Sequence, residues 1–94
     1  MNNTIFTIIR TISINRLFSY DIYKVKSGGI EKKHYHSFFE IVHIIKGTSS
    51  SHIQGRWYFY KRGQIHEFVN DSQKEMIISV LTIPPETAEG TYFI

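Results

Sequence analysis

The 94-residue chain contains no cysteine, and this absence removes several kinds of chemistry at once. Disulfide bridges, thiolate nucleophiles and cysteine-ligated zinc all require a thiol. Histidine and carboxylate side chains are then the remaining metal ligands to look for. The lack of disulfides is also compatible with a reducing compartment, so we expect a cytoplasmic protein.

The chain also lacks a long apolar run. A membrane-spanning helix needs about 20 consecutive apolar residues. The isoleucine-rich start, TIFTIIRTISI, is interrupted by Arg10 and by threonines, and it lacks the basic segment and the small-residue cleavage site of a secretion signal. We therefore predict a soluble protein with no membrane partner.

The net charge of +3 is small and unevenly placed, because every Lys and Arg except Lys74 precedes Gly63. A basic face for an anionic partner is one interpretation, and a solvated surface is the other and the favoured one. The sequence shows no helix-turn-helix pattern, RNP-type aromatic motif or basic helical region. We expect no nucleic-acid contact by this chain itself.

Short segments rich in Ile, Val, Tyr, Phe and Thr dominate the sequence and predict strands. Turn signals such as SGG, KGTSS, KRG and NDS separate them, and no stretch has a helical period. Strands at this spacing indicate an all-β sandwich or barrel, here a single domain over residues 1–94. The terminal TYFI predicts a last strand or a docked tail. The strands are TISI, YDIYKVK, FFEIVHII, RWYFY, HEFV and MIISVLTI.

The stretch HYHSFFE concentrates polar side chains on one predicted face. Successive side chains of a strand point to opposite faces, so His34, His36 and Glu40 project together, with Phe38 between them. Two imidazoles and a carboxylate inside a narrow barrel are costly unless they bond to something. His43 has the opposite parity, so we exclude it from the group.

A third histidine, His66, follows the turn in KRGQIHEFVN and begins a strand. If that strand lies beside the first, three nitrogens and one oxygen surround a common point. Such a set suits a divalent transition metal, with Zn, Mn, Fe, Ni, Co and Cu all chemically possible. A hydrogen-bonded polar cluster without metal, or a pocket for a polar ligand, explains the same pattern.

We predict that His52, which follows only turn-like residues, is solvent-exposed.

The run from Trp57 to Tyr60 is entirely aromatic, so alternate members must face opposite sides of the sheet. Core packing is the simplest role, and stacking on a planar ligand or covering a dimer interface are the others. The residues assigned to a predicted ligand pocket are Phe38, Trp57, Phe59 and Phe68.

The spacing of the glycines and histidines resembles the cupin superfamily. Its first motif runs Gly, five residues, His, one residue, His, three residues, Glu, six residues, Gly. Every position of that motif is met, by Gly28, His34, His36, Glu40 and Gly47.

The second cupin motif runs Gly, five residues, Pro, one residue, Gly, two residues, His, three residues, Asn. Gly55, Gly63, His66 and Asn70 fit it, while Lys61 replaces the proline. The resemblance implies a small jelly-roll β-barrel in which His34, His36, Glu40 and His66 are the metal ligands.

Only seven residues separate Gly47 from Gly55, so we expect a barrel shortened by the strand pair that cupins usually have between the motifs. A second alignment starts the second motif at Gly63. That alignment puts the usual histidine near residues 71–74, where the sequence has none.

Within the cupins, HYHSFFEIVHIIKG and KRGQIHEF are similar to the amino-terminal domain of AraC-type transcription regulators. This resemblance implies a sensor-like module that binds a small-molecule ligand. A metal-dependent cupin enzyme of the dioxygenase or isomerase type is the alternative, and a structural cupin with a vestigial site is the third. No helix-turn-helix units lie within the 94 residues, so we do not expect a complete regulator if this sequence is the full protein; a fragment of a longer regulator is the other interpretation. We also expect a homodimer, paired through an edge strand near the amino terminus.

Overall fold

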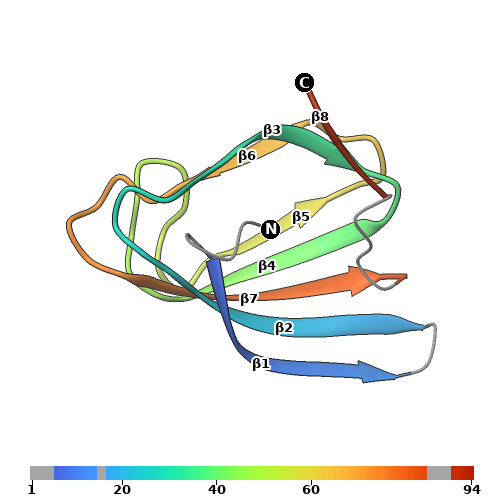
Figure 1. Ribbon diagram of the computed structural model, residues 1–94, viewed down its shortest axis with the longest axis horizontal. Coiled ribbons are helices and arrows are strands. Elements are labelled where there is room, and N and C mark those ends of the chain that lie inside the picture. The colour runs from blue at the N-terminus through green and yellow to red at the C-terminus, as the bar shows by residue number, and fades with distance from the viewer. Residues whose placement is uncertain (1–5, 15–16, 85–89) are drawn as a thin grey trace.

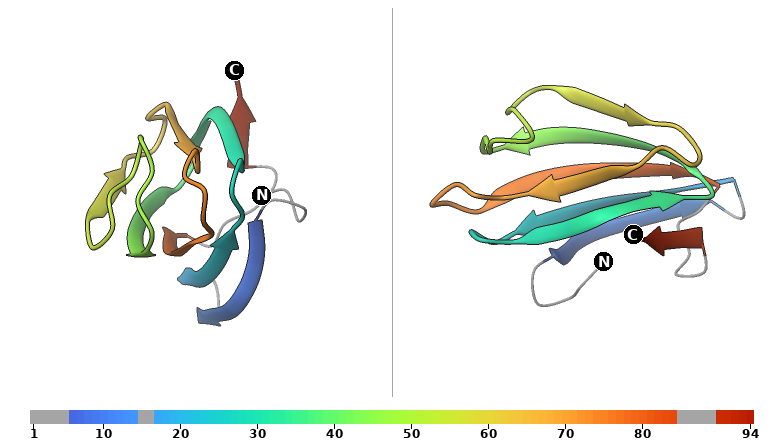
Figure 2. Two further views of the ribbon diagram at one scale, coloured as in Figure 1. Left: turned by 90° about the vertical axis from the view of Figure 1, so that its left-hand side faces the viewer. Right: turned by 90° about the horizontal axis from the view of Figure 1, so that it is seen from above.

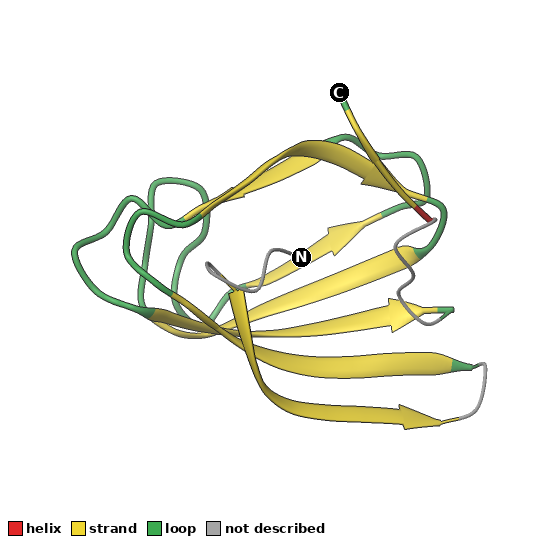
Figure 3. Ribbon diagram, viewed as in Figure 1, coloured by secondary structure: helices red, strands yellow, loops and turns green. Residues whose placement is uncertain are grey.

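The computed structural model describes residues 6–14, 17–84 and 90–94, and almost all of its regular structure is strand (Figure 1, Figure 3). Within these ranges no helix is long and apolar enough to cross a membrane. The strands are β1 (Phe6–Ile14), β2 (Phe18–Val25), β3 (Ile30–His36), β4 (Phe39–Lys46), β5 (Trp57–Tyr60), β6 (His66–Val69), β7 (Met76–Ile83) and β8 (Thr91–Phe93).

The strands form two facing sheets. One sheet has the order β1-β2-β7-β4-β5 and the other has the order β6-β3-β8, and neighbouring strands run antiparallel. The two layers are visible edge-on in Figure 2. This is the small all-β jelly-roll barrel that the sequence predicts, and the terminal TYFI contributes its last strand, β8.

Strict alternation of side chains along β2, β4 and β7 builds the apolar core. In β4, for example, Val42 and Ile44 are buried while Ile41 and His43 are only half-buried on the outer face. The larger sheet therefore contributes most of the core, and β6 adds one aromatic ring from the facing sheet. The core cluster comprises Tyr23, Val25, Val42, Ile44, Phe68, Met76, Ile78 and Val80.

The segment between β4 and β5 is a loop over residues 47–56 and contains no strand. The predicted shortening is confirmed, because the strand pair that cupins usually have at this place is missing. The loop closes on the end of β4, where the Gly55 N–H donates to the Ile44 carbonyl and the Ile44 N–H donates to the Arg56 carbonyl. As a result β4 and β5 pair directly, with Glu40 opposite Tyr60.

The prediction that His52 is solvent-exposed is wrong. Its side chain is only 3% exposed, and its ring contacts those of Tyr58 and Phe68. The Nδ1 atom lies 2.6 Å from Ser51 Oγ, and the Nε2 atom lies 2.7 Å from Tyr60 Oη. The short loop folds back onto the barrel and carries this imidazole inward, which turn-like residues before a histidine do not reveal.

Strand β1 is an edge strand of the larger sheet, since it pairs only with β2 among the described strands. An edge strand exposes unpaired backbone groups that a second copy can pair with. The homodimer through this strand stays a prediction.

Gly47, which closes the first motif, allows a sharp test of packing at the end of β4. Its φ is +92°, and a Cβ there would lie 2.8 Å from Met76 Cγ and 3.2 Å from the Glu75 carbonyl oxygen. We expect Gly47→Ala to lower the free energy of unfolding by about 2–4 kcal/mol, through left-handed strain and overpacking together. Urea denaturation measures this loss.

The matched control is Gly28→Ala, because Gly28 has a φ of +82° and no atom within 4 Å of the added Cβ. Strain alone should cost this variant about 1 kcal/mol. Equal losses for the two variants would contradict the crowding at Gly47.

The buried His52 should make stability depend on pH. Burial lowers the pKa of His52 to about 4, with His66 adding to the effect and Glu40 opposing it. The unfolded chain takes up this proton near pH 6.5 and the folded chain only near pH 4, so stability is full above pH 6.5 and is lost as the pH falls between these values. The loss attributable to His52 is about 3 kcal/mol.

The measurement compares the pH dependence of the unfolding free energy between the unmodified protein and His52→Gln. We expect the variant to lose less stability between pH 6.5 and pH 4. His43→Gln, a substitution on the outer face, is the matched control. Parallel curves for His52→Gln and the unmodified protein would refute the assignment.

Candidate metal centre

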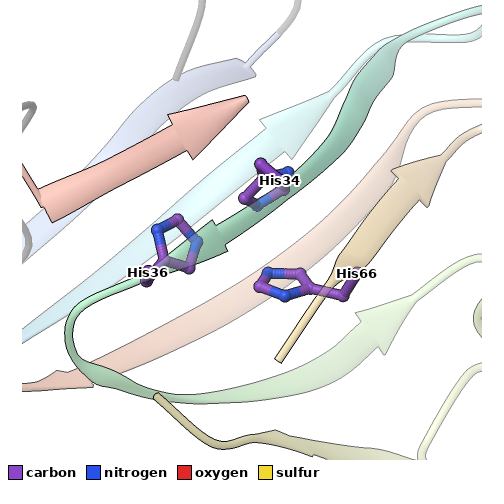
Figure 4. Close-up of side chains that lie close together, drawn as sticks. All are labelled: His34, His36 and His66. Atoms are coloured by element: carbon purple, nitrogen blue, oxygen red, sulfur yellow. The ribbon is translucent and has the colours of Figure 1, made fainter. Parts of the chain in front are cut away.

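The three predicted histidines meet between β3 and β6 (Figure 4). The two strands pair so that His34 lies directly opposite His66, and His36 follows on the same face of β3. One nitrogen from each ring lies within 4.8 Å of the others. The pairing that the sequence could only suppose, β6 beside β3, is therefore what brings His66 to the cluster.

Glu40 reaches the cluster from β4, in the other sheet. Its Oε2 lies 3.2 Å from His36 Nε2 and its Oε1 lies 3.6 Å from His66 Nε2. Burial alone would raise the pKa of Glu40, but the contacts with His36 and His66 outweigh it and lower the pKa to about 2. All four predicted ligands thus come together, with the carboxylate ionised.

Backbone carbonyls fix the protonation pattern of two of the rings. The Lys32 carbonyl lies against His34 Nδ1, and the Gln64 carbonyl lies 3.0 Å from His66 Nδ1. A carbonyl only accepts hydrogen bonds, so each Nδ1 carries a proton and donates it. Nε2 is then the nitrogen that each ring presents to the cluster. In metal-binding histidines generally, the ring nitrogen that does not bind the metal donates its N–H to such an acceptor, and this orients the ring.

Four buried atoms at the centre of the cluster have no hydrogen-bond partner among the described residues: the Nε2 atoms of His34, His36 and His66, and Oε2 of Glu40. Carboxylate oxygens of Glu31 and Glu40 lie 2.9–3.6 Å from these nitrogens as ion-pair contacts, and their geometry completes no hydrogen bond. Leaving such a group unsatisfied costs about 1–3 kcal/mol. The three histidine nitrogens lie within 4.8 Å of one another and Glu40 adjoins two of them, so the residues present fit a metal ion of the Mn to Zn series.

Sequence reasoning missed Glu31. Its Oε1 lies 2.9 Å from His34 Nε2, and its side chain is 11% exposed. Strand parity places residues 31 and 34 on opposite faces, but the pairing of β3 with β6 has an irregular register between them. The contact holds the pKa of His34 above its usual value, against the opposing effect of burial.

A sequence signal for this irregularity does exist. The adjacent Lys32 and Lys33 are both exposed, whereas a regular strand would turn one of them inward. Burying a lysine ammonium without a partner is costly, so two adjacent lysines before a buried histidine favour a bulge at that point.

A cavity adjoins the cluster at Glu40 and His66. Its empty volume is about 270 Å³, including the part open to solvent. Apolar side chains from the larger sheet form part of its lining, and the polar groups of the cluster form another part. The cavity is lined by Glu31, Glu40, Val42, His52, Tyr60, His66, Glu67, Phe68, Ile78 and Val80.

The four predicted pocket residues occupy different places. Phe68 lines the cavity, whereas Phe38 is buried against the His36 ring, with ring centroids 4.3 Å apart. Trp57 and Phe59 lie on the outer face of the sheet, 67% and 54% exposed, and do not line the cavity. Their prediction as pocket residues does not fit the structure, because the pairing of Glu40 with Tyr60 and of Val42 with Tyr58 gives the inward positions of β5 to the tyrosines.

The inward positions of β5 belong instead to the tyrosines. Glu40 faces the interior and is paired with Tyr60, so Tyr60 faces the interior as well. Its ring stacks on the His66 ring at 4.0 Å between centroids and 9° between planes. His43, which parity excluded from the site, stacks on Trp57 at the outer face.

Comparison with solved structures supports the fold. The chain is similar to TT1209 from Thermus thermophilus, with 20% identity, a TM-score of 0.74, and coverage of 90% of this chain and 89% of that one. A cupin domain from Bordetella pertussis Tohama I gives 17% identity, a TM-score of 0.64, and coverage of 83% and 92%. The polyketide cyclase RemF from Streptomyces resistomycificus gives 18% identity, a TM-score of 0.72, and coverage of 85% and 62%. At these identities the likeness shows a shared cupin fold.

No curated protein matches the chain significantly. The family model of the AraC-like ligand binding domain matches residues 29–91, a range that includes the histidine cluster, the cavity-lining residues and the start of β8. Both histidine segments lie within this match. The chain belongs to the AraC-like ligand-binding domain family of cupins.

Proposed function

We propose that this domain is a sensor-like module that holds a divalent transition metal ion and binds a small metabolite beside it. The observation that carries the proposal is the convergence of four buried atoms without hydrogen-bond partners among the described residues, on His34, His36, Glu40 and His66. Each is a good ligand for a borderline divalent ion. A metal bound there would offer an open coordination position to a polar group of the ligand.

The cavity limits the size of that metabolite. The 270 Å³ includes open solvent, and the enclosed part has room for about one water-sized group, far less than the roughly 300–1,000 Å³ of ordinary ligand pockets. Glu40 and Tyr60 contribute polar atoms to the lining, and Val42, Ile78 and Val80 contribute apolar surface. A metabolite would therefore place one small polar group in the enclosed part and keep the rest of its body in the part that is open to solvent.

One observation favours the second function that the sequence suggests, a metal-dependent enzyme. Tyr60 stacks on His66, and its hydroxyl is 2.7 Å from His52 Nε2, so a proton-exchanging pair lies at the edge of the cavity. Burial raises the pKa of Tyr60, which keeps the hydroxyl protonated at neutral pH. Such a group can orient a bound ligand by a hydrogen bond or give it a proton.

The metal-binding part of the proposal predicts the behaviour of a double variant. We expect the unmodified protein, purified and loaded with Mn²⁺ or Zn²⁺, to hold about one ion per chain, because one set of ligands is present. His34→Ala combined with His36→Ala should abolish this binding, since two of the four ligands are lost. Elemental analysis after gel filtration measures the metal content.

His43→Ala is the matched control, because it removes a histidine from the outer face of the same barrel. A chelator should lower the thermal midpoint of the unmodified protein and of this control but leave that of the double variant unchanged. If the double variant and the control held equal amounts of metal, His34 and His36 would not be metal ligands, and the cluster would be a vestigial structural feature.

The sensor reading predicts that a bound metabolite is not transformed. Metal-loaded protein is screened by thermal shift against monosaccharides and small carboxylic acids, and a compound that binds is recovered and identified by mass spectrometry. We expect the compound unchanged, and Tyr60→Phe should weaken its binding by about 2–10-fold through the loss of one hydrogen bond. Conversion of the compound, abolished in Tyr60→Phe, would establish the enzyme alternative instead.

A further inference from the structure

The Glu31 carboxylate lies beside His34 Nε2, the ring nitrogen that faces the cluster. Glu31 falls in the five-residue gap of the first cupin motif, where the motif specifies no residue type. We propose that Glu31 is a fifth protein ligand of the metal ion, so that the centre consists of three imidazole nitrogens and two carboxylate oxygens. This inference rests on the proposed metal binding and adds a ligand to it.

The His34 nitrogen that Glu31 contacts decides whether Glu31 is placed to bind the metal or only to orient the imidazole ring. A carboxylate that only orients a metal-binding histidine accepts from the ring nitrogen that points away from the metal. In His34 that nitrogen is Nδ1, and the Lys32 carbonyl already occupies it. Glu31 lies 2.9 Å from Nε2, the atom directed at the cluster. Glu31 is therefore on the metal side of the ring.

The distance from each carboxylate to its nearest imidazoles is close to that between neighbouring ligands of one ion, and the three imidazole nitrogens lie within 4.8 Å of one another. Bonds of about 2.1 Å at octahedral or tetrahedral angles separate adjacent ligand atoms by about 3.0–3.4 Å. The observed separations are 2.9 Å for Glu31 and His34, 3.2 Å for Glu40 and His36, and 3.6 Å for Glu40 and His66. Glu31 thus stands in the same relation to His34 as Glu40 does to the other two rings.

The fold supplies Glu31 through the irregular register of β3. Glu31 is paired with Phe68 and His34 with His66, and the regular ladder is interrupted between these pairs. Without that interruption, a separation of three residues would send the carboxylate to the outer face. Bulges commonly redirect a side chain next to a functional site. Glu31 also lines the cavity together with Glu40 and His66.

Charge balance explains why a second carboxylate belongs here. Three neutral imidazoles and Glu40 alone would leave one net positive charge on a buried divalent ion, and burying a net charge is costly. Two carboxylates neutralise the ion. Five protein ligands also leave one position on a six-coordinate metal, which suits Mn²⁺, Fe²⁺ or Co²⁺ better than a tetrahedral ion.

The test is calorimetric titration of the unmodified protein and of Glu31→Gln with Mn²⁺ and Co²⁺, together with the visible absorption spectrum of the Co²⁺ form. We expect Glu31→Gln to bind both ions at least about tenfold more weakly. The Co²⁺ absorption per ion should also change, because the coordination sphere loses an anionic oxygen. Glu75→Gln, which removes an exposed acid that does not line the cavity, should change neither quantity.

The direction of the effect discriminates between roles. If Glu31 merely shares a proton with His34, it competes with the metal, and Glu31→Gln would bind metal as tightly or more tightly. That result would overturn the inference, and so would weaker binding with an unchanged Co²⁺ spectrum, which indicates an effect through His34. If the unmodified protein binds neither ion, the proposed function itself fails. Should Glu31→Gln not fold, Glu31→Asp withdraws the oxygen by one methylene and is expected to weaken binding in the same way.

Discussion

The pairing of β3 with β6 is the constraint on which the site depends. It places His34 opposite His66, on two strands separated in sequence by β4, a loop and β5. After the loop over residues 47–56, β5 pairs with β4 and the chain then returns to the smaller sheet as β6. The histidine cluster thus forms in a barrel that has no strand between β4 and β5.

The same arrangement divides the interior into an apolar and a polar part. Val25, Ile44 and Met76 are completely buried in the apolar part, and their burial contributes roughly 1.5–3 kcal/mol for each side chain. The polar part stabilises the fold less, since four of its buried atoms lack partners among the described residues. A domain of this size has a small margin of stability. An ion bound at the cluster would therefore couple metal binding to folding, because it would remove a cost that the folded chain otherwise carries.

Strand parity predicts part of this structure and fails where the backbone departs from a regular ladder. His34, His36 and Glu40 share a face because β3 and β4 keep their alternation near these residues, and His43 is excluded for the same reason. Glu31 was missed because of the irregular register that precedes His34. Trp57 and Phe59 were misplaced because parity within a strand does not say which half faces inward. That choice is set by the partner strand, here by Glu40 opposite Tyr60. His52 shows a third limit, since the path of a loop depends on tertiary packing and not on local composition.

The proposed sensor function would need a connection between the site and another part of the molecule, and β3 links the cluster to β8. The strand carries three of the residues at the cluster and pairs with β8, the last of the described strands. His36 Nδ1 lies 2.9 Å from the Thr91 hydroxyl of β8, so the orientation of this imidazole and the position of the last strand are linked. Since the Nε2 atom of the same ring faces Glu40 at the centre, a ligand that moves His36 also acts on the contact with β8. Strand β3 thus connects the histidine cluster to β8 both by backbone pairing and by the contact between His36 and Thr91.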